Sequence, residues 1–253
     1  MDLEIIEIKR DISNFFHNNK ERYENFNKLQ EYLDHINENT YSLAIQFIEQ
    51  RKNFFFQDHP TTIFFLVNMI YTAEYNFKHI EHYFDVLVYF KQEIIRGANS
   101  EEEILCLCSI YPISVNYLFY KQFFSIESIF KISSTDKYIF TIFYPEIEQY
   151  DQEYAQKCAS RYFQYKSDKL YYFYTFAKSN PKQHIQYRNS FYHQSRLHKS
   201  IRDDDVDTFQ SLLSQNNFNI NHKIEHSIFE RAKTLDDDLT LIQISALYGS
   251  LSI

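Results

Sequence analysis

Glycine, proline and tryptophan are scarce or missing in this sequence: its 253 residues include 2 Gly, 4 Pro and no Trp. The tight turns of β-sandwiches and β-barrels rely on glycine and proline, so the composition argues against these all-β folds. Helices can be joined by ordinary polar residues. The composition therefore predicts an all-α chain, with one or two compact domains or a single elongated one.

Cysteines and long apolar runs are also few. Cys106, Cys108 and Cys158 are an odd number without the spacing of a disulfide framework, which predicts reduced thiols in a cytoplasmic protein. The densest apolar run, Ile63–Val67, is too short to span a bilayer. The start of the chain, Met1–Glu4, lacks the basic and apolar stretches of a signal peptide.

Positive charge is in deficit as well. The formal net charge is −8, whereas a nucleic acid or an anionic membrane surface would need a clustered basic face. We therefore expect neither as a partner. Two isolated glycines cannot form a glycine-rich phosphate loop, and we expect no cofactor. A Ser–His–Asp triad stays open from the sequence, although the nucleophile-elbow motif is missing.

Aromatic residues are abundant, with 25 Phe and 22 Tyr. Tyrosine and phenylalanine are enriched at protein interfaces, which allows a binding role. The alternative is an AT-rich genome, whose codons favour these residues. Since most of the aromatic residues recur at helical spacing, we expect them mainly in the core.

The N-terminal region has apolar residues at alternating steps of three and four. They are Ile5, Ile8, Ile12, Phe15, Phe26, Leu29, Leu33 and Ile36. The first four of these residues and the last four share one heptad phase, which fits a single long helix pairing with a partner helix. Two successive polar seam residues, Asn19 and Arg22, favour the alternative of two amphipathic helices joined at the polar stretch His17–Arg22.

Helical spacing continues along the chain to about residue 178. The predicted helices are Tyr41–Asn53, Thr61–Tyr75, Phe77–Ile94, Glu102–Tyr111, Ser114–Phe124, Lys137–Phe143, Glu153–Tyr165 and Lys169–Lys178.

Several short stretches predict where these helices begin and end. Pro60 disfavours helix at the preceding residue, so Thr61 or Thr62 is expected to cap the next helix. Gly97–Ser100 is the clearest loop, and Ser100 with Glu103 forms a predicted capping box. Pro112 and Pro145 punctuate the helices that follow, and the polar composition of 180–195 marks the best domain boundary.

The C-terminal part shows a more specific pattern. Leu197 and Ile201 lie in one expected helix, and Val206, Phe209, Leu212 and Leu213 line one face of a second, before a polar turn at Asn216–Asn221. This is a helix–turn–helix unit of solenoid type. The last stretch repeats its opening. Thr240–Gln243 parallels Ser195–His198, Ser245–Ala246 parallels Ser200–Ile201, and Gly249 parallels Asp204.

These positions resemble the ankyrin-repeat pattern, roughly T-P-L-H-x-A-A-x-x-G followed by V-x-x-L-L and a turn that ends in Asn. The residues that fit are Leu197, His198, Leu212, Leu213, Asn221, Thr240, Ile242, Ser245, Ala246 and Gly249. Leu241 and Gln243 replace the proline and histidine of the pattern, and Asp204 stands at the glycine of the earlier unit. Thr240 with Gln243 predicts a capping box, and Gly249 suits a left-handed turn. Ser245 and Ala246 are small, so we expect them at the contact between adjacent repeats.

The chain also resembles a large, divergent protist family of ankyrin-repeat proteins with a helical N-terminal domain of unknown function. The matching stretches are Ile224–Gly249, Tyr75–Leu87, Tyr117–Phe123 and Tyr144–Tyr165. The resemblance implies a helical leader over 1–190, followed over 191–253 by one degenerate ankyrin repeat and a truncated second repeat. It implies protein–protein interaction, with a partner and oligomeric state that the sequence does not identify, and no known catalytic activity.

Few residue clusters carry catalytic or metal-binding chemistry. His222, Glu225 and His226 read as H-x-x-E-H, which on a helix places two zinc ligands and a general base together, but the motif lacks its distant acidic ligand. His79 and His82 share a helix face without a third ligand. Asp203–Asp205 and Asp236–Asp238 lack the EF-hand pattern and are better explained as charges at helix starts.

We therefore expect a non-enzymatic interaction or scaffold module, elongated and solenoid-like, with its binding surface on the 195–221 unit. The first alternative is a fragment or capping module of a longer ankyrin-repeat protein without activity of its own. The remote alternative is a zinc-dependent hydrolase that uses His222, Glu225 and His226.

Overall fold

Most of the described residues are helical in the computed structural model, which describes residues 20–76, 79–165, 169–189, 196–216, 223–224 and 239–248. The first described helix covers 20–34. The others are α2 (Tyr41–Gln50), α3 (Lys52–Phe55), α4 (His59–Tyr75), α5 (Ile80–Tyr89), α6 (Lys91–Gly97), α7 (Glu101–Cys108), α8 (Pro112–Tyr120), α9 (Ile126–Ser133), α10 (Lys137–Ile142), α11 (Tyr144–Tyr150), α12 (Gln152–Tyr162), α13 (Lys169–Ser179), α14 (Pro181–Asn189), α15 (Arg196–Arg202), α16 (Val206–Asn216) and α17 (Leu241–Tyr248). Within these ranges, no helix is both long and apolar enough to cross a membrane.

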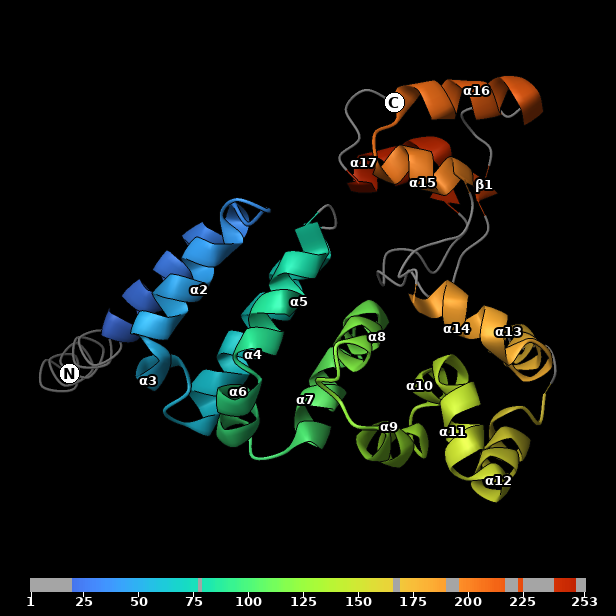
Figure 1. Ribbon diagram of the computed structural model, residues 1–253, viewed down its shortest axis with the longest axis horizontal. Helices are drawn as coiled ribbons and strands as arrows, with labels where there is room; N and C mark the ends of the chain where they lie inside the picture. The colour runs from blue at the N-terminus through green and yellow to red at the C-terminus, as the bar shows by residue number, and fades with distance from the viewer. Residues whose placement is uncertain are drawn as a thin grey trace, which may run out of the picture.

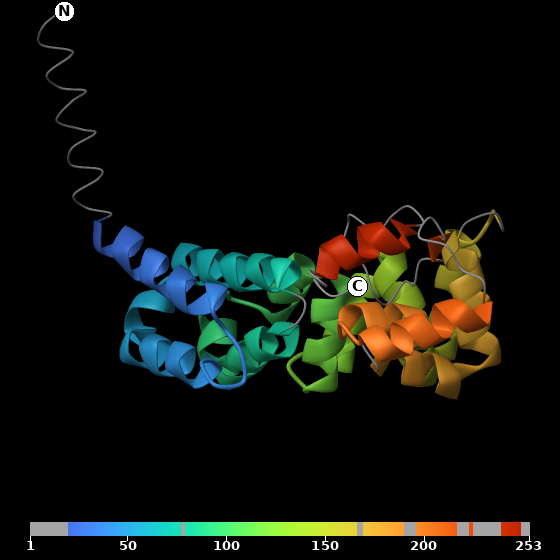
Figure 2. The same ribbon diagram turned by 90° about the horizontal axis from the view of Figure 1, so that it is seen from above.

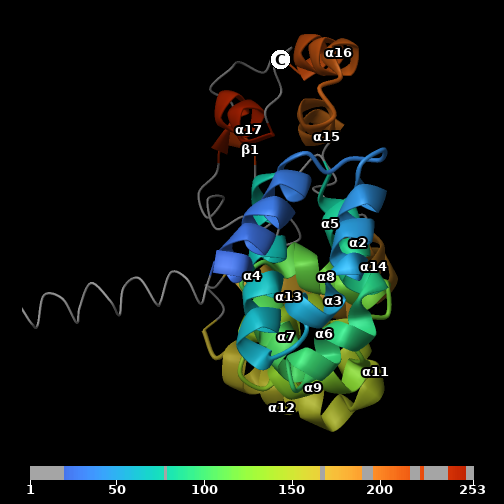
Figure 3. The same ribbon diagram turned by 90° about the vertical axis from the view of Figure 1, so that its left-hand side faces the viewer.

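The helices α2 to α14 follow one another broadly in chain order along the long axis of the molecule (Figure 1). Seen from above, this row gives the structure an elongated outline (Figure 2). The helices α15, α16 and α17 lie to one side of the row, as the end-on view also shows (Figure 3). The expectation of an all-α chain is confirmed. The one exception within the described residues is a short antiparallel pair of two-residue strands, β1 (Lys223–Ile224) and β2 (Leu239–Thr240).

Aromatic side chains fill much of the interior of the row. The ring of Phe55, which is fully buried, lies within 6.0 Å of those of Phe26, Phe47 and Phe65. The buried hydroxyl of Tyr83 donates to the backbone oxygen of Leu33 at 2.5 Å, and burial raises the pKa of Tyr83 to about 12. Phe26, Leu29, Leu33 and Ile36 are also buried, as their spacing predicts.

The predicted start of α4 is wrong, and proline explains why. The cap of α4 is Asp58, whose carboxylate accepts a hydrogen bond from the Thr61 backbone at 2.8 Å, and neither Thr61 nor Thr62 is the cap. Pro60, like Pro112 and Pro145, lies in the first turn of a helix. A first-turn proline costs nothing there because its missing N–H would have no partner in the helix. The N-terminal joint predicted at His17–Arg22 lies in part outside the described residues, and the described helix begins within it at Lys20.

Several helices are shorter than predicted, and three helices were not predicted. The expected helix ending at Ile94 is broken at Phe90, and the one ending at Asn53 is broken at Arg51. The elements α9, α11 and α14 were not predicted. The helix α14 occupies most of the stretch 180–195 that its polar composition had marked as a domain boundary, and it packs on α13 and α8.

Gly97 is the last residue of α6 and not part of a loop. A Cβ atom at this position would lie 2.2 Å from the hydroxyl oxygen of Thr62 in α4. The residue is therefore glycine because α6 and α4 approach each other closely. The left-handed backbone of the following turn is taken by Asn99, with φ of 67°. Asparagine tolerates that conformation better than most residues.

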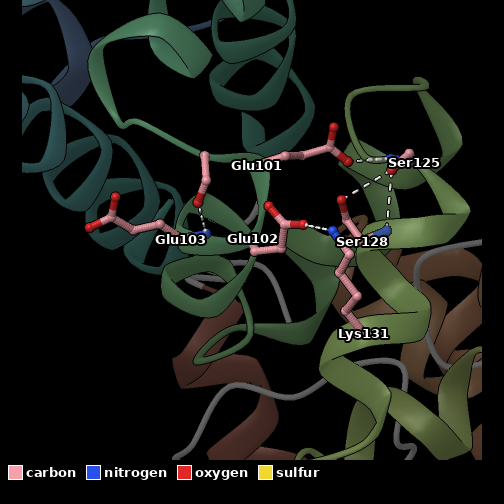
Figure 4. A network of polar contacts seen from close by, with 7 residues as sticks. Glu101, Glu102, Glu103, Ser125, Ser128 and Lys131 are labelled. Carbon is pink, nitrogen blue, oxygen red and sulfur yellow. Dashed lines mark hydrogen bonds and ion pairs between the residues drawn. The ribbon is translucent and has the colours of Figure 1, made fainter.

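The N-terminus of α7 contacts both α4 and α9 through polar side chains, and Figure 4 shows the contacts with α9. Ser100 caps α7 as predicted, accepting a hydrogen bond from the Glu103 backbone at 3.1 Å. The Glu103 carboxylate does not return to Ser100 and lies 2.8 Å from Nε2 of His59 in α4. Glu101 accepts from the backbone N–H of Ser125, and Glu102 pairs with Lys131 of α9. These contacts tie α7 to α4 on one side and to α9 on the other.

Candidate interaction surface

The three C-terminal helices share a small hydrophobic core of their own. Its buried members are Leu197, Ile201, Leu212, Leu241 and Ile244, with Phe209 and Leu213 packed against them. The helix α15 lies between the other two, since both α16 and α17 contact it. The predicted packing of Leu197, Leu212 and Leu213 within one unit is confirmed.

The turn from α15 to α16 is left-handed at Asp204, with φ of 51°. The Asp204 backbone N–H donates to the oxygen of Ile201 at 3.1 Å, and that of Asp205 donates to Ser200 at 2.8 Å. This is the hydrogen-bond pattern of a Schellman motif, whose left-handed position is usually glycine. The ankyrin-like pattern places its glycine at the same position. Aspartate tolerates the conformation at a smaller cost than most side chains.

Asp205 then caps α16. Its carboxylate accepts a hydrogen bond from the Thr208 backbone at 3.0 Å, and the hydrogen bonds from Thr208 hold the pKa of Asp205 below its usual value. Asp205, the last residue of the acidic run Asp203–Asp205, therefore lies at a helix start as predicted, whereas Asp203 and Asp204 lie in the turn after α15. The run Asp236–Asp238 lies outside the described residues.

The predicted capping box at the start of α17 is confirmed. The Thr240 backbone N–H donates to Oε1 of Gln243 at 2.9 Å, and the Gln243 backbone N–H donates to the Thr240 hydroxyl at 3.4 Å. Thr240 also pairs with Lys223 in the strands β1 and β2. The strand pair and the capping box together fix the chain as it enters α17.

The two repeat-like helices differ in what they bury. Leu197 and Ile201 of α15 are 5% and 0% exposed, whereas their predicted equivalents in α17 are exposed, Ile242 to 55% and Ala246 as well. Of the two small residues expected at the contact between repeats, Ser245 is buried, whereas Ala246 faces solvent, so that half of the prediction is wrong. The helix α17 packs on α15 through Leu241 and Ile244. Its opposite face carries Ile242 and Ala246, which are four residues apart and therefore adjacent on one side of the helix.

Some predicted residues lie outside the described part of the chain. They are Asn221, Gly249, the side chain of His198, and the motif residues His222, Glu225 and His226. The helix that the H-x-x-E-H motif requires is contradicted, because Lys223–Ile224 between its first two members is a strand. The zinc-hydrolase hypothesis relied on a helix to bring His222 and His226 to one side, and the strand at Lys223–Ile224 removes that argument.

The other candidate ligands are not gathered into a metal site. Within the described ranges, no group of three or more His, Cys, Asp or Glu side chains is placed to hold a metal ion. The rings of His79 and His82 stack 6.0 Å apart, and Tyr41 stacks on His82 at 5.2 Å. Cys106 is exposed and Cys108 is buried on α7, so their thiols point apart.

The main polar cluster of the interior was missed from the sequence. Arg188 and His184 of α14 are buried and both lie against the backbone oxygen of Ile142, at 3.2 and 2.8 Å. Arg188 also pairs with Glu146 of α11, and Asn116 of α8 donates to the Arg188 backbone oxygen at 2.5 Å. The spacing of four between His184 and Arg188, after the helix-starting Pro181, was the available signal.

This cluster has the contacts of a structural element. His184 is kept neutral by burial, which lowers its pKa to about 4. The Arg188 guanidinium lies over the ring of Phe143 at 4.6 Å and is almost fully enclosed. The cluster pairs the charge of Arg188 with that of Glu146 and holds α14 against α11.

Comparisons with known protein families, with curated proteins and with solved structures give no significant match to this chain.

Proposed function

We propose that the chain is a non-enzymatic protein-interaction module of ankyrin-repeat type, in which α15 to α17 form a short solenoid-like end. The proposal is supported by the exposure of Ile242 and Ala246, whose equivalents Leu197 and Ile201 are buried. A repeat helix normally buries this face against its neighbour. The face of α17 is therefore suited to another helical element of similar shape. The exposed ridge of α15 and α16 is the second surface for a partner.

The proposal is tested by placing charge on the exposed side of α17 that carries Ile242 and Ala246. The variant Ile242→Asp/Ala246→Asp is compared with Gln156→Asp/Ser160→Asp, a pair at the same spacing on the exposed side of α12. Affinity capture from the native cell is followed by binding measurements with the purified partner. We expect the α17 variant to bind at least about fivefold more weakly, the effect of losing one significant interface contact. Equal binding by both variants, or a folded protein that captures no partner above background, would contradict the proposal.

The same open face also favours the alternative of a fragment or capping module. In that case the exposed side of α17 would be covered by the second helix of its own repeat and not by a separate protein. Appending an ankyrin-type second helix after Ile253 distinguishes the two. The capping alternative predicts a higher melting temperature and less aggregation for the extended chain, together with no captured partner. The interaction module predicts that the added helix competes with the partner for the same face.

A further inference from the structure

A groove lies between the 20–34 helix and α4, far from the C-terminal unit. It encloses about 520 Å³. The residues that matter here are Tyr23, Phe26, Asn27 and Gln30 from the first helix and Phe64 and Asn68 from α4. The ring of Phe64 stands edge-on to Phe26 at 4.6 Å and forms the apolar floor. Gln30 donates to Thr72 of α4 at 3.3 Å and closes one end.

The helix α4 is rich in apolar residues, yet some of them are uncovered. Phe65, Leu66, Met69 and Ile70 are buried in the core. Phe64, which lines the groove, and Val67 and Tyr71, which follow it at spacings of three and four, are 44 to 54% exposed. Apolar side chains on one side of a helix are normally covered by a neighbouring element. The groove therefore has the shape and chemistry to receive one more amphipathic helix.

The chain carries a segment that matches this groove. Residues 1–19 lie outside the described part of the chain and join the 20–34 helix at the end where Tyr23 lies. Ile5, Ile8, Ile12 and Phe15 recur there at steps of three and four, the spacing of a groove-binding helix. A helix over 5–15 would be about 16 Å long, and the groove from Tyr23 to Gln30 extends about 11 Å, at 1.5 Å per residue.

We propose that residues 5–15 form an amphipathic helix that folds back and packs antiparallel into the groove, with Ile12 opposite Tyr23 and Ile8 opposite Asn27. Residues 16–19 supply the connection, and four residues are within the usual length between antiparallel helices. The segment of the same chain is favoured over a second copy because a short tether gives it a millimolar effective concentration. A groove filled in this way is closed to helices of other proteins.

A single tryptophan tests the packing, because the sequence contains none. Phe64→Trp places the reporter in the groove. It is combined with Ile8→Asp/Ile12→Asp on the apolar side of the segment, or with Arg10→Asp/Asn14→Asp on its opposite side. We expect the Ile variant to shift the emission to longer wavelength and to increase quenching by acrylamide. The matched control should leave both unchanged. Circular dichroism establishes that each variant remains folded. Identical spectra for the two variants overturn the proposal.

Cross-linking identifies which chain supplies the helix. Ile8→Cys/Asn27→Cys is made in a Cys106→Ser background, since Cys106 is the exposed native thiol. Mild oxidation should give a monomeric disulfide species on a non-reducing gel. The control Arg10→Cys/Asn27→Cys places the thiol on the other side of the segment and should not cross-link. A covalent dimer would assign the groove to a second copy, and no disulfide would leave the groove empty. Either result overturns the proposal.

Discussion

Arg188 and Glu146 form a bidentate ion pair inside the row of helices, with nitrogen–oxygen distances of 2.9 and 2.5 Å. The guanidinium is 2% exposed and the carboxylate 19%. Arg188 comes from α14 and Glu146 from the first turn of α11, 42 residues earlier in the chain. Together with Asn116 of α8, the pair fixes the position of α14, the last helix before the C-terminal unit.

Removing one member of this ion pair should lower the free energy of unfolding more than removing both members. In Glu146→Gln the buried Arg188 keeps its charge and loses its partner, which costs about 3 kcal/mol of unfolding free energy. The double variant Glu146→Gln/Arg188→Met buries no charge and should recover part of that loss. Urea denaturation measures both. The exposed pair of Glu102 and Lys131 is the control, because Glu102→Gln should change stability by less than about 1 kcal/mol. Equal losses at the two sites would contradict the buried-pair argument.

His184 should make the fold sensitive to mild acid. Burial lowers its pKa from 6.5 to about 4 in the folded chain. Between these values the unfolded chain binds a proton that the folded chain does not, so stability falls as the pH decreases from about 6.5 to 4. The loss is about 3 kcal/mol in total and about 2 kcal/mol by pH 5.

The variant His184→Gln isolates this effect. Glutamine can still donate to the backbone oxygen of Ile142 but does not titrate. Urea unfolding at pH 7.5 and pH 5 should show a smaller loss for the variant than for the original chain. An unchanged difference between the two pH values would assign the acid sensitivity to other groups.

The helix α14 shows why part of the fold could not be predicted from the sequence. Its residues are mostly polar, and sequence patterns assign buried faces to apolar residues. His184 and Arg188 are buried against partners on α10 and α11, and those partners are more than 40 residues away. Long-range pairing of this kind leaves little trace in local composition. By contrast, the caps at Ser100 and Thr240 depend on neighbours three residues away and were predicted from the sequence.

The candidate surface was predicted in part for the same reason. The spacing of Leu197, Leu212 and Leu213 identified the core of the unit, since local periodicity decides which helix face is apolar. Whether Ile242 and Ala246 are covered depends on what stands next to α17, and no local pattern contains that information. Gly97 was misread because its role is a close contact with Thr62, which lies 35 positions earlier in the sequence.

Gly97→Ala should destabilise the chain although alanine is the better helix former. In an exposed helix this change gains up to about 1 kcal/mol. Here the new methyl group meets the buried Thr62 side chain at 2.2 Å, and such overpacking costs about 1–3 kcal/mol. Adding Thr62→Ala removes the hydroxyl and methyl that clash and should restore part of the loss. The urea midpoints of the two variants and of the original chain show whether Gly97→Ala lowers or raises stability. A Gly97→Ala protein as stable as the original would show that α4 and α6 separate easily.

The left-handed turn at Asp204 predicts an unusual order of substitutions. At φ of 51° a side chain with a Cβ atom is strained, whereas glycine is not. Asp204→Gly should therefore be more stable than Asp204→Ala by about 1 kcal/mol, and both lack the carboxylate, so its contacts cancel in the comparison. At the neighbouring Asp203, whose φ is not positive, alanine should be the better of the two. Hydrogen exchange of peptides from α15 and α17 reports the stability of this unit separately from the larger core. If alanine and glycine rank in the same order at both positions, the turn is not held in the left-handed conformation in solution.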